Sequence, residues 1–198
     1  MYSIVKRIVD IIISIIAILF LLPFYFAISF VILISSGMPI FFLQERVGKN
    51  WVPFKIIKFR TMIREAQNLG PGISSESDNR ITAAGKFLRK FKLDELPQFF
   101  NVFKGDMSVI GPRPELLKYA YHFRDDYSSI LKIKPGITDF ASIKYRNEAA
   151  LLNEGNRESI YINKILPDKI VLYKKYINEI GFITDMKIIL NTIKGIIL

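Results

Sequence analysis

The residues of this chain that are best suited to chemistry are two adjacent carboxylates, Asp94 and Glu95. Asp94 fits the N-cap of a helix running to about residue 103, because Pro97 then falls in the first turn, where a missing N–H is harmless. One interpretation is structural: Asp94 caps the helix and Glu95 complements its dipole. The other interpretation is chemical. A carboxylate at a helix N-terminus can attack phosphorus or bind Mg²⁺. Its neighbour can then serve as a metal ligand or as a proton acceptor.

Phosphate chemistry at this pair requires cations that neutralise the negative charge of the substrate. Arg113 is the strongest candidate, because Pro112 and Pro114 on either side stiffen its backbone and fix the direction of its guanidinium. An isolated arginine is usually a surface charge, but a Gly-Pro-Arg-Pro setting is unusual and favours a phosphate clamp. The other predicted phosphate- or substrate-binding residues are Lys58, Arg60, Arg80 and Arg89.

A long uncharged segment upstream indicates that this chemistry takes place at a membrane. No charged residue occurs from Ile11 to Leu43. Its first part, Ile11–Ile34, would be about 36 Å long as a helix, which is enough to cross a hydrocarbon core of roughly 30 Å. A cleavable signal peptide fits poorly, because the apolar stretch is too long and no small-x-small cleavage site follows it.

The cations on both sides of this segment favour a re-entrant helix over a single crossing. Lys6 and Arg7 precede it, and Pro23 in its middle removes a backbone donor and bends or breaks a helix. Because positive flanks stay on the cytoplasmic side, both ends are expected there. We therefore predict a re-entrant membrane helix broken at Pro23 over residues 1–43 and a cytoplasmic, membrane-associated catalytic domain over 44–198. The cations that follow are Arg46, Lys49, Lys55, Lys58, Arg60 and Arg64.

Composition narrows the kinds of site and partner. The 198 residues suit one domain of ordinary size with a small addition. The chain has no Cys, which excludes disulfides and thiolate metal sites, and its single His122 excludes a multi-His cluster and argues against a Ser/His triad. A net charge of +10 attracts anionic lipids, phosphorylated substrates or nucleic acid, and the apolar segment favours the first two.

The remaining pattern predicts an α+β fold that is mostly helical. Phe41–Val47 and Trp51–Phe59 are rich in aromatic and β-branched residues and flank a turn at 48–50, which predicts a β-hairpin whose second strand Pro53 makes an edge. The last helix is amphipathic and either rests on lipid or covers the core. Helices are expected over 62–67, 81–91, 94–103, 116–131, 148–152, 159–165, 168–179 and 184–197, with a short strand or irregular segment over 137–143.

Beyond these local patterns, the chain resembles a known family, the monotopic phosphoglycosyl transferases, which are bacterial sugar transferases. The likeness is to the small members with a minimal catalytic domain. It extends in order over most of residues 4–147, so no single short motif carries it. The matching segments include Gln44–Gly48, Lys58–Met62, Arg80–Thr82, Gly85–Arg89, Leu93–Gln98, Asn101–Ser108, Ile110–Glu115 and Lys134–Thr138.

The resemblance implies a two-step exchange at the cytoplasmic face of the bacterial inner membrane, which initiates glycoconjugate assembly. Asp94 would attack the β-phosphate of a UDP-sugar, UMP would leave, and undecaprenyl phosphate, a polyprenol phosphate, would take the phosphosugar from the aspartyl intermediate. Mg²⁺ would neutralise the diphosphate, with Asp94 and Glu95 as its ligands. The family's re-entrant helix, broken at a proline, matches Pro23. The implied partners are thus a UDP-sugar, a polyprenol phosphate and membrane lipids.

Three positions depart from the family pattern. Leu22 precedes the helix-breaking proline where Ser is common, Asp139 replaces Gly after Thr138, and Lys144–Asn147 replaces a later Asn-Gly-Arg-Asn motif. The last two are expected to bear on nucleotide or sugar recognition. An alternative to the enzyme is a non-catalytic basic membrane anchor that binds anionic lipid or a partner enzyme. A nucleic-acid binder is disfavoured, because the basic residues are scattered and form no known binding module.

Overall fold

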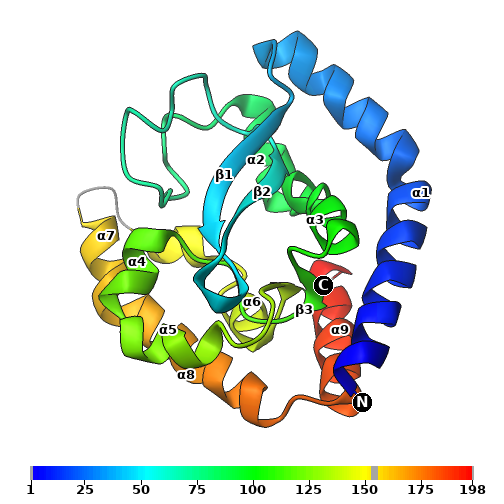
Figure 1. The fold of residues 1–198 in the computed structure, drawn as a ribbon. Coiled ribbons are helices and arrows are strands. Elements are labelled where there is room, and N and C mark those ends of the chain that lie inside the picture. The colour runs from blue at the N-terminus through cyan, green and yellow to red at the C-terminus, as the bar shows by residue number, and fades with distance from the viewer. Residues whose placement is uncertain (1, 153–155, 198) are drawn as a thin grey trace.

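The computed structural model describes residues 2–152 and 156–197, and it begins with one long helix, α1 (Tyr2–Ser36). Pro23 lies inside α1, and the helix bends in its middle instead of ending there (Figure 1). The predicted break is thus a bend, because a proline removes one backbone hydrogen bond and the turns on either side can absorb the loss. Among the described residues, α1 is the one helix long and apolar enough to cross a membrane by length and composition.

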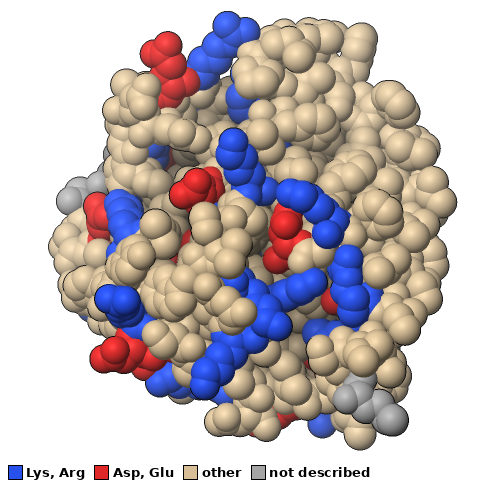
Figure 2. Space-filling model, viewed as in Figure 1, with Lys and Arg blue, Asp and Glu red and all other residues tan. Residues whose placement is uncertain are grey.

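Both ends of α1 are attached to the rest of the molecule. Near the N-terminal end of α1, Nη1 of Arg7 donates a hydrogen bond of 2.6 Å to the carbonyl oxygen of Val102. At the other end, Nη2 of Arg60 donates to the carbonyl oxygens of Ser36 at 2.7 Å and Gly37 at 2.5 Å. The helix therefore lies along one side of the domain, and this edge shows an almost uninterrupted uncharged surface (Figure 2).

Asp185 holds the first turns of α1 against the C-terminal helices. Its carboxylate accepts hydrogen bonds from Tyr2 at 2.6 Å and from the buried Tyr176 at 2.8 Å, and it pairs with Lys6 at 2.5 Å. The last helix was expected over residues 184–197. That helix, α9 (Phe182–Ile197), begins earlier, and the Asp185 side chain bonds to other helices.

We expect Asp185→Ala to lower the free energy of unfolding by about 1–3 kcal/mol, because it leaves the buried Tyr176 hydroxyl without an acceptor. Urea unfolding of the detergent-solubilised protein, followed by circular dichroism, measures the change. The matched control is Glu179→Ala, an exposed acid at the end of the preceding helix, which should change stability by less than about 0.5 kcal/mol. Equal stability of the two variants would contradict the role given to Asp185.

The predicted hairpin is confirmed and stands at the centre of the fold (Figure 1). Strands β1 (Phe41–Val47) and β2 (Pro53–Phe59) pair antiparallel with Phe41 opposite Phe59. The turn between them holds Asn50 and Trp51 at positive φ. Pro53 opens β2, so its missing N–H interrupts no ladder inside the strand. The hairpin presents Lys58, near the end of β2, to the interior of the molecule.

A second, two-stranded parallel sheet supports the Gly-Pro-Arg-Pro turn. It pairs β3 (Ser108–Ile110) with β4 (Gly136–Thr138). Immediately after β3, Gly111 lies so close to Gly136 that a Cβ on Gly136 would come within 2.1 Å of the Gly111 nitrogen. Only glycines allow this approach. The turn that carries Arg113 is therefore fixed against β4.

The helices surround these two sheets, and several differ from the sequence-based expectation. The helix expected over 62–67 is absent from these described residues: Met62 forms an isolated bridge with Ile81, and a turn follows over 64–68. The helix expected over 116–131 is divided at Phe123, whose φ and ψ of −119° and 46° are not helical. The remaining helical elements are α2 (Ala83–Lys90), η2 (Leu93–Glu95), α3 (Gln98–Lys104), α4 (Leu117–His122), α5 (Arg124–Ile130), α6 (Phe140–Lys144), η3 (Glu148–Leu151), α7 (Arg157–Ile160), η4 (Tyr161–Ile165) and α8 (Leu166–Asn178).

Two apolar clusters hold these elements in place. The larger one gathers buried tyrosines, including Tyr119, Tyr127 and Tyr173, from α4, α5 and α8. A smaller one joins Ile32 of α1 to Phe59 of β2 and to α2. Since η2 follows α2 directly, this second cluster places η2 beside the end of β2. The helix α9 both covers the core through Ile188 and leaves other apolar side chains exposed, so neither role expected for it excludes the other.

Candidate active site

A cleft of about 1380 Å³ opens between the hairpin, the segment that follows it and the region of η3 and α8. All seven residues predicted from the sequence to bind or act on substrate line it. Twelve Lys or Arg side chains and six Asp or Glu side chains face it, so an anionic ligand is attracted into it. The predicted residues among them are Lys58, Arg60, Arg80, Arg89, Asp94, Glu95 and Arg113.

The backbone of η2 turns the carboxylate pair into this cleft. Lys92, directly before η2, has a φ of 57°, so the chain reverses sharply after α2. Helix α3 begins only at Gln98, and neither it nor η2 has a side-chain cap. The expectation that Asp94 caps a helix is therefore wrong. Without a capping role, the structural interpretation of Asp94 loses its main support.

Glu95 is fixed by two cations. Arg113 donates both arms of its guanidinium to the carboxylate, Nη1 to Oε2 at 3.0 Å and Nη2 to Oε1, and Lys58 donates to Oε1 at 2.8 Å. Burial alone would raise the pKa of Glu95, but the charges and hydrogen bonds of Arg113 and Lys58 outweigh it and hold that pKa well below its usual value. Glu95 is therefore an ionised, immobile group between two cations.

Asp94 has the opposite environment. Its side chain is buried, with 7% of the residue exposed, and no described residue donates a hydrogen bond to Oδ1. Burial first, and then the negative charge of Glu95, raise the pKa of Asp94, while Lys58, Arg89 and Lys92 oppose the rise. Such a carboxylate is poorly solvated and has an unpartnered oxygen, whereas both oxygens of its neighbour accept hydrogen bonds. The pair is thus divided into one unpartnered and one fixed member.

Arg89 approaches Asp94 from α2. Its guanidinium is oriented by Nε donating to Oγ1 of Thr61 at 2.8 Å and Nη1 donating to Oγ of Ser74 at 2.6 Å. Burial lowers the pKa of Arg89, and the charge of Asp94 partly restores it. Burial likewise lowers the pKa of Lys58. Both cations lie at the end of the cleft that holds the two carboxylates.

Arg60 and Arg80 also line the cleft, but the hydrogen bonds that they donate go to other parts of the chain. Arg60 donates through Nη2 to the last carbonyls of α1. Arg80 bonds both oxygens of Asp78, at 2.9 and 2.7 Å, and the carbonyl oxygen of Ala66. These two arginines fix the wall of the cleft, whereas Lys58, Arg89 and Arg113 surround the carboxylates.

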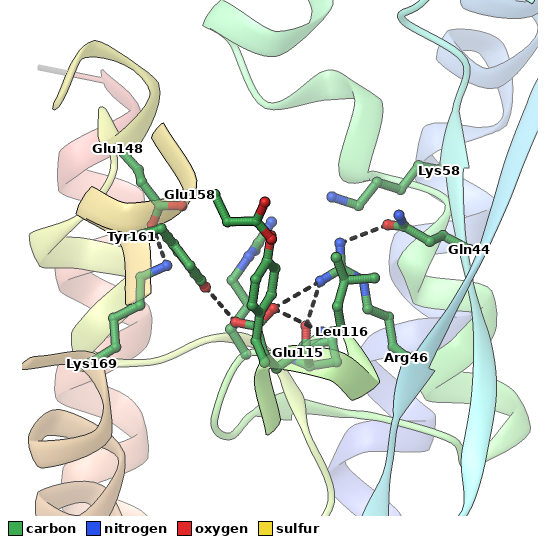
Figure 3. A network of polar contacts seen from close by, with 12 residues as sticks. Gln44, Arg46, Lys58, Glu115, Leu116, Glu148, Glu158, Tyr161 and Lys169 are labelled. Atoms are coloured by element: carbon green, nitrogen blue, oxygen red, sulfur yellow. Dashed lines mark hydrogen bonds and ion pairs between the residues drawn. The ribbon is translucent and has the colours of Figure 1, made fainter. Parts of the chain in front are cut away.

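The structure also brings to the cleft residues that the sequence did not single out (Figure 3). Glu115 accepts a hydrogen bond from Tyr161 and pairs with Arg46 at 3.4 Å, so it joins β1 to η4 below the cleft. Lys169 of α8 pairs with Glu148 on the wall opposite Lys58. Glu115 directly follows the Pro-Arg-Pro sequence, which offered a signal. No sequence pattern pointed to the pair of Glu148 and Lys169.

The residues present fit a magnesium ion that binds together with a diphosphate. Mg²⁺ commonly takes one or two carboxylates and completes its coordination with substrate phosphates and water. The unpartnered Oδ1 of Asp94 is such a ligand, and Glu95 adds negative charge beside it. No group of three or more His, Asp or Glu side chains suited to a metal occurs in the described part of the chain, so the substrate would have to supply the other ligands.

Proteins of one known family are similar to this chain. The sequence model of a family described as bacterial sugar transferase matches residues 1–198. The chain is 41% identical over 145 residues, 72% of its length, to the UDP-N-acetylgalactosamine-undecaprenyl-phosphate N-acetylgalactosaminephosphotransferase of Aeromonas hydrophila. It is 33% identical over 197 residues, 97% of its length, to the UDP-glucose:undecaprenyl-phosphate glucose-1-phosphate transferase of Escherichia coli.

The extent of these matches differs between relatives. The chain spans 34% of the Aeromonas protein and 40% of the Escherichia coli protein. It spans 82% of the exopolysaccharide production protein ExoY of Sinorhizobium fredii, to which it is 30% identical over 186 residues, or 85% of its own length. With the family match over residues 1–198, these findings show that the chain belongs to the bacterial sugar transferase family.

Proposed function

We propose that this protein transfers a phosphosugar from a UDP-sugar to undecaprenyl phosphate and releases UMP. The observation that carries the proposal is the divided carboxylate pair: Asp94 has a free, poorly solvated oxygen, and the adjacent Glu95 is fixed by Arg113 and Lys58. The names of the relatives support the donor and acceptor classes. The reaction would start the assembly of a bacterial polysaccharide or other glycoconjugate.

In the first step, an oxygen of Asp94 attacks the β-phosphorus of the UDP-sugar. The bond from that phosphorus to the oxygen bridging the two phosphates breaks, and UMP leaves with the electron pair. Arg113, Lys58 and Arg89 lie where they can neutralise the diphosphate and the departing phosphate. Mg²⁺, which Asp94 would hold beside the negative charge of Glu95, would supply further charge neutralisation when bound.

In the second step, a phosphate oxygen of undecaprenyl phosphate attacks the same phosphorus, and Asp94 leaves as a carboxylate. The products are the undecaprenyl diphosphosugar and the regenerated enzyme, so one phosphoanhydride is exchanged for another and no proton is gained or lost. A covalent intermediate suits two substrates of such different polarity, because the nucleotide leaves before the lipid reacts.

The location of the reaction follows from α1. Both of its ends contact the same domain, and its outer surface is apolar, which supports a helix that enters one leaflet and returns. Cations flank both ends, and they favour the cytoplasmic side of the bacterial inner membrane. In this arrangement residues 1–43 anchor the protein, and residues 44–198 form the catalytic domain at the membrane surface, where the acceptor phosphate lies.

The experiment that tests the proposal measures UMP. The purified protein in detergent micelles is incubated with Mg²⁺, undecaprenyl phosphate and each of several UDP-sugars. We expect UMP to form in amounts equal to the undecaprenyl diphosphosugar, and chelation of Mg²⁺ to stop both. A protein that binds anionic lipid vesicles but forms no UMP with any UDP-sugar would instead be a membrane anchor without this activity.

The raised pKa of Asp94 gives the reaction a pH dependence. Attack requires the carboxylate form, and the pKa of Asp94 is raised by burial and by Glu95, so protonation removes activity at a higher pH than for an ordinary Asp. We expect kcat/KM to fall on the acid side as the pH drops through this raised pKa. Lys92→Met should move the fall to still higher pH, because Lys92 lowers the pKa of Asp94.

The control is Lys164→Met, which removes an exposed cation outside the cleft and should leave the pH profile unchanged. The pH dependence of UMP release gives all three profiles. An acid limb that lies in the ordinary carboxyl range and does not move in Lys92→Met would show that Asp94 is not the group whose ionisation limits the reaction.

A further inference from the structure

A buried ion pair forms the wall of the cleft opposite Lys58. Lys169 is 4% exposed, and its Nζ pairs with Oε2 of Glu148. The ammonium also lies over two aromatic rings, 4.9 Å from the centroid of Tyr161 and 5.7 Å from that of Tyr145. A buried lysine is costly unless it is paired, and the two rings leave it little freedom to move. Lys169 is thus a fixed anchor for the carboxylate of Glu148.

Both residues line the cleft, and Glu148 is the more exposed half of the pair. It begins η3, and a quarter of its side chain is exposed, whereas that of Lys169 is 5% exposed. Figure 3 shows Glu148 and Lys58 on opposite sides of the same space. The charge of Glu148 also contributes, after that of Glu95, to raising the pKa of Arg113, so the two groups interact electrostatically. Glu148 therefore belongs to the site where a ligand held by Arg113 would lie.

The chemistry of a carboxylate limits what it can bind there. An ionised carboxylate only accepts hydrogen bonds, and it repels phosphate. The diphosphate is attracted instead by Lys58, Arg89 and Arg113. A donor molecule that places its phosphates among these cations brings the hydroxyls of the ribose and of the transferred sugar as its most numerous hydrogen-bond donors, besides the N3–H of uracil. Glu148 is placed to accept from one of these.

We propose that Glu148, oriented by Lys169, is a specificity-determining residue that accepts hydrogen bonds from hydroxyl groups of the UDP-sugar; this rests on the function proposed above. Glu148 touches the donor substrate, and Lys169 acts only through Glu148 as a positioning residue. A carboxylate held in one direction by a buried cation discriminates between hydroxyl arrangements better than a freely rotating one, because a wrongly placed hydroxyl leaves it unpaired. Donor choice would therefore depend on residues 144–150, where the sequence also departs from the family pattern.

Glu148→Gln tests the proposal, because it keeps the shape of the side chain and removes its charge. For the UDP-sugar that the wild type uses best, we expect KM to rise about 10–100-fold, the loss typical of a hydrogen bond to a charged group. The value of kcat should stay within about threefold, since the lost contact is present in both ground and transition states. Glu148→Asp, which keeps the charge but shortens the side chain, should show a smaller rise in KM.

Inhibition by UMP distinguishes the two sources of hydroxyl groups. An unchanged inhibition constant in Glu148→Gln, together with the raised KM, assigns Glu148 to the transferred sugar. A constant that rises by the same factor as KM assigns it to the uridine part of the donor. The panel of UDP-glucose, UDP-N-acetylglucosamine and UDP-N-acetylgalactosamine then shows whether the preference among sugars narrows or disappears, and its disappearance supports the first assignment.

Glu158→Gln is the matched control. Glu158 also pairs with a lysine, Lys118 at 2.6 Å, but it lies outside the residues that line the cleft, so its KM should not change. Circular dichroism melting checks that each variant is folded. The contradicting result is a folded Glu148→Gln whose KM for each UDP-sugar and whose inhibition constant for UMP stay within about twofold of wild type. Glu148 then merely neutralises Lys169, and the inference is wrong. A wild-type protein that forms no UMP would instead contradict the proposed function itself.

Discussion

Asp94→Asn is expected to lower kcat/KM for UMP release by at least about 10³-fold, since removal of a nucleophile abolishes the covalent route. The amide is nearly the same size as the carboxylate, so the buried site stays filled. It is a far weaker nucleophile, and it also loses the negative charge that Lys58, Arg89 and Lys92 surround. The effect should fall on kcat, because the lost interaction is the reacting bond itself.

The control for this variant is Asp125→Asn, which makes the same substitution on the exposed surface of α5 and should retain full activity. Initial rates of UMP formation with saturating UDP-sugar and undecaprenyl phosphate give the comparison. Full activity of Asp94→Asn, with Asp125→Asn also active, would remove Asp94 from the role of nucleophile while leaving the overall reaction in place.

Arg113→Lys is the second large effect, with an expected loss of about 10²-fold in kcat/KM. Arg113 contacts Glu95 with two arms of one planar group, and a lysine keeps the charge but offers a single point of contact. The substitution should therefore misplace both the cation and the Glu95 carboxylate. We expect Arg113→Lys and Glu95→Gln to be strongly non-additive, because each variant breaks the same pair.

The matching control is Arg124→Lys, an exposed arginine of α5 that lies outside the cleft. Kinetics of the two single variants, the double variant and this control, together with their thermal stabilities, separate catalysis from folding. An Arg113→Lys enzyme within about threefold of wild type would show that the charge of Arg113 suffices and its fork geometry contributes nothing.

The parts of the fold that follow local rules could be predicted from the sequence. The hairpin was recognisable because β-branched and aromatic residues flank a short turn, and the apolar helix because charges are absent over a long stretch. The division of residues 116–131 at Phe123 could not be predicted, because both halves have helical periodicity. Only the packing of α4 and α5 against the core selects a break there.

The candidate site was predictable in its residues but only partly in its geometry. The unusual settings of Asp94, Glu95 and Arg113 identified them, and the structure brings them together with Lys58 and Arg89. Sequence reasoning assigned Asp94 to a helix cap because Pro97 suits a first turn, but the positive φ of Lys92 changes the path of the chain before it.

The partnership of Glu148 with Lys169 lay beyond sequence reasoning altogether. These residues come from separate elements, and only the way η3 and α8 pack brings their charges together. The same holds for Asp185, whose partners Tyr2 and Lys6 stand at the opposite end of the chain. Long-range polar pairs of this kind leave no periodic pattern, because each partner looks like an ordinary surface charge in its own segment.

The most direct test of the covalent mechanism is a single turnover without acceptor. The protein is mixed with Mg²⁺ and a UDP-sugar in the absence of undecaprenyl phosphate, and UMP and the intact protein mass are measured together. We expect up to one UMP per protein, a mass increase equal to one phosphosugar located on Asp94 by peptide mapping, and its loss when undecaprenyl phosphate is added. A wild-type enzyme that turns over fully with acceptor, yet without it releases no UMP and gains no mass, would contradict a covalent intermediate on Asp94.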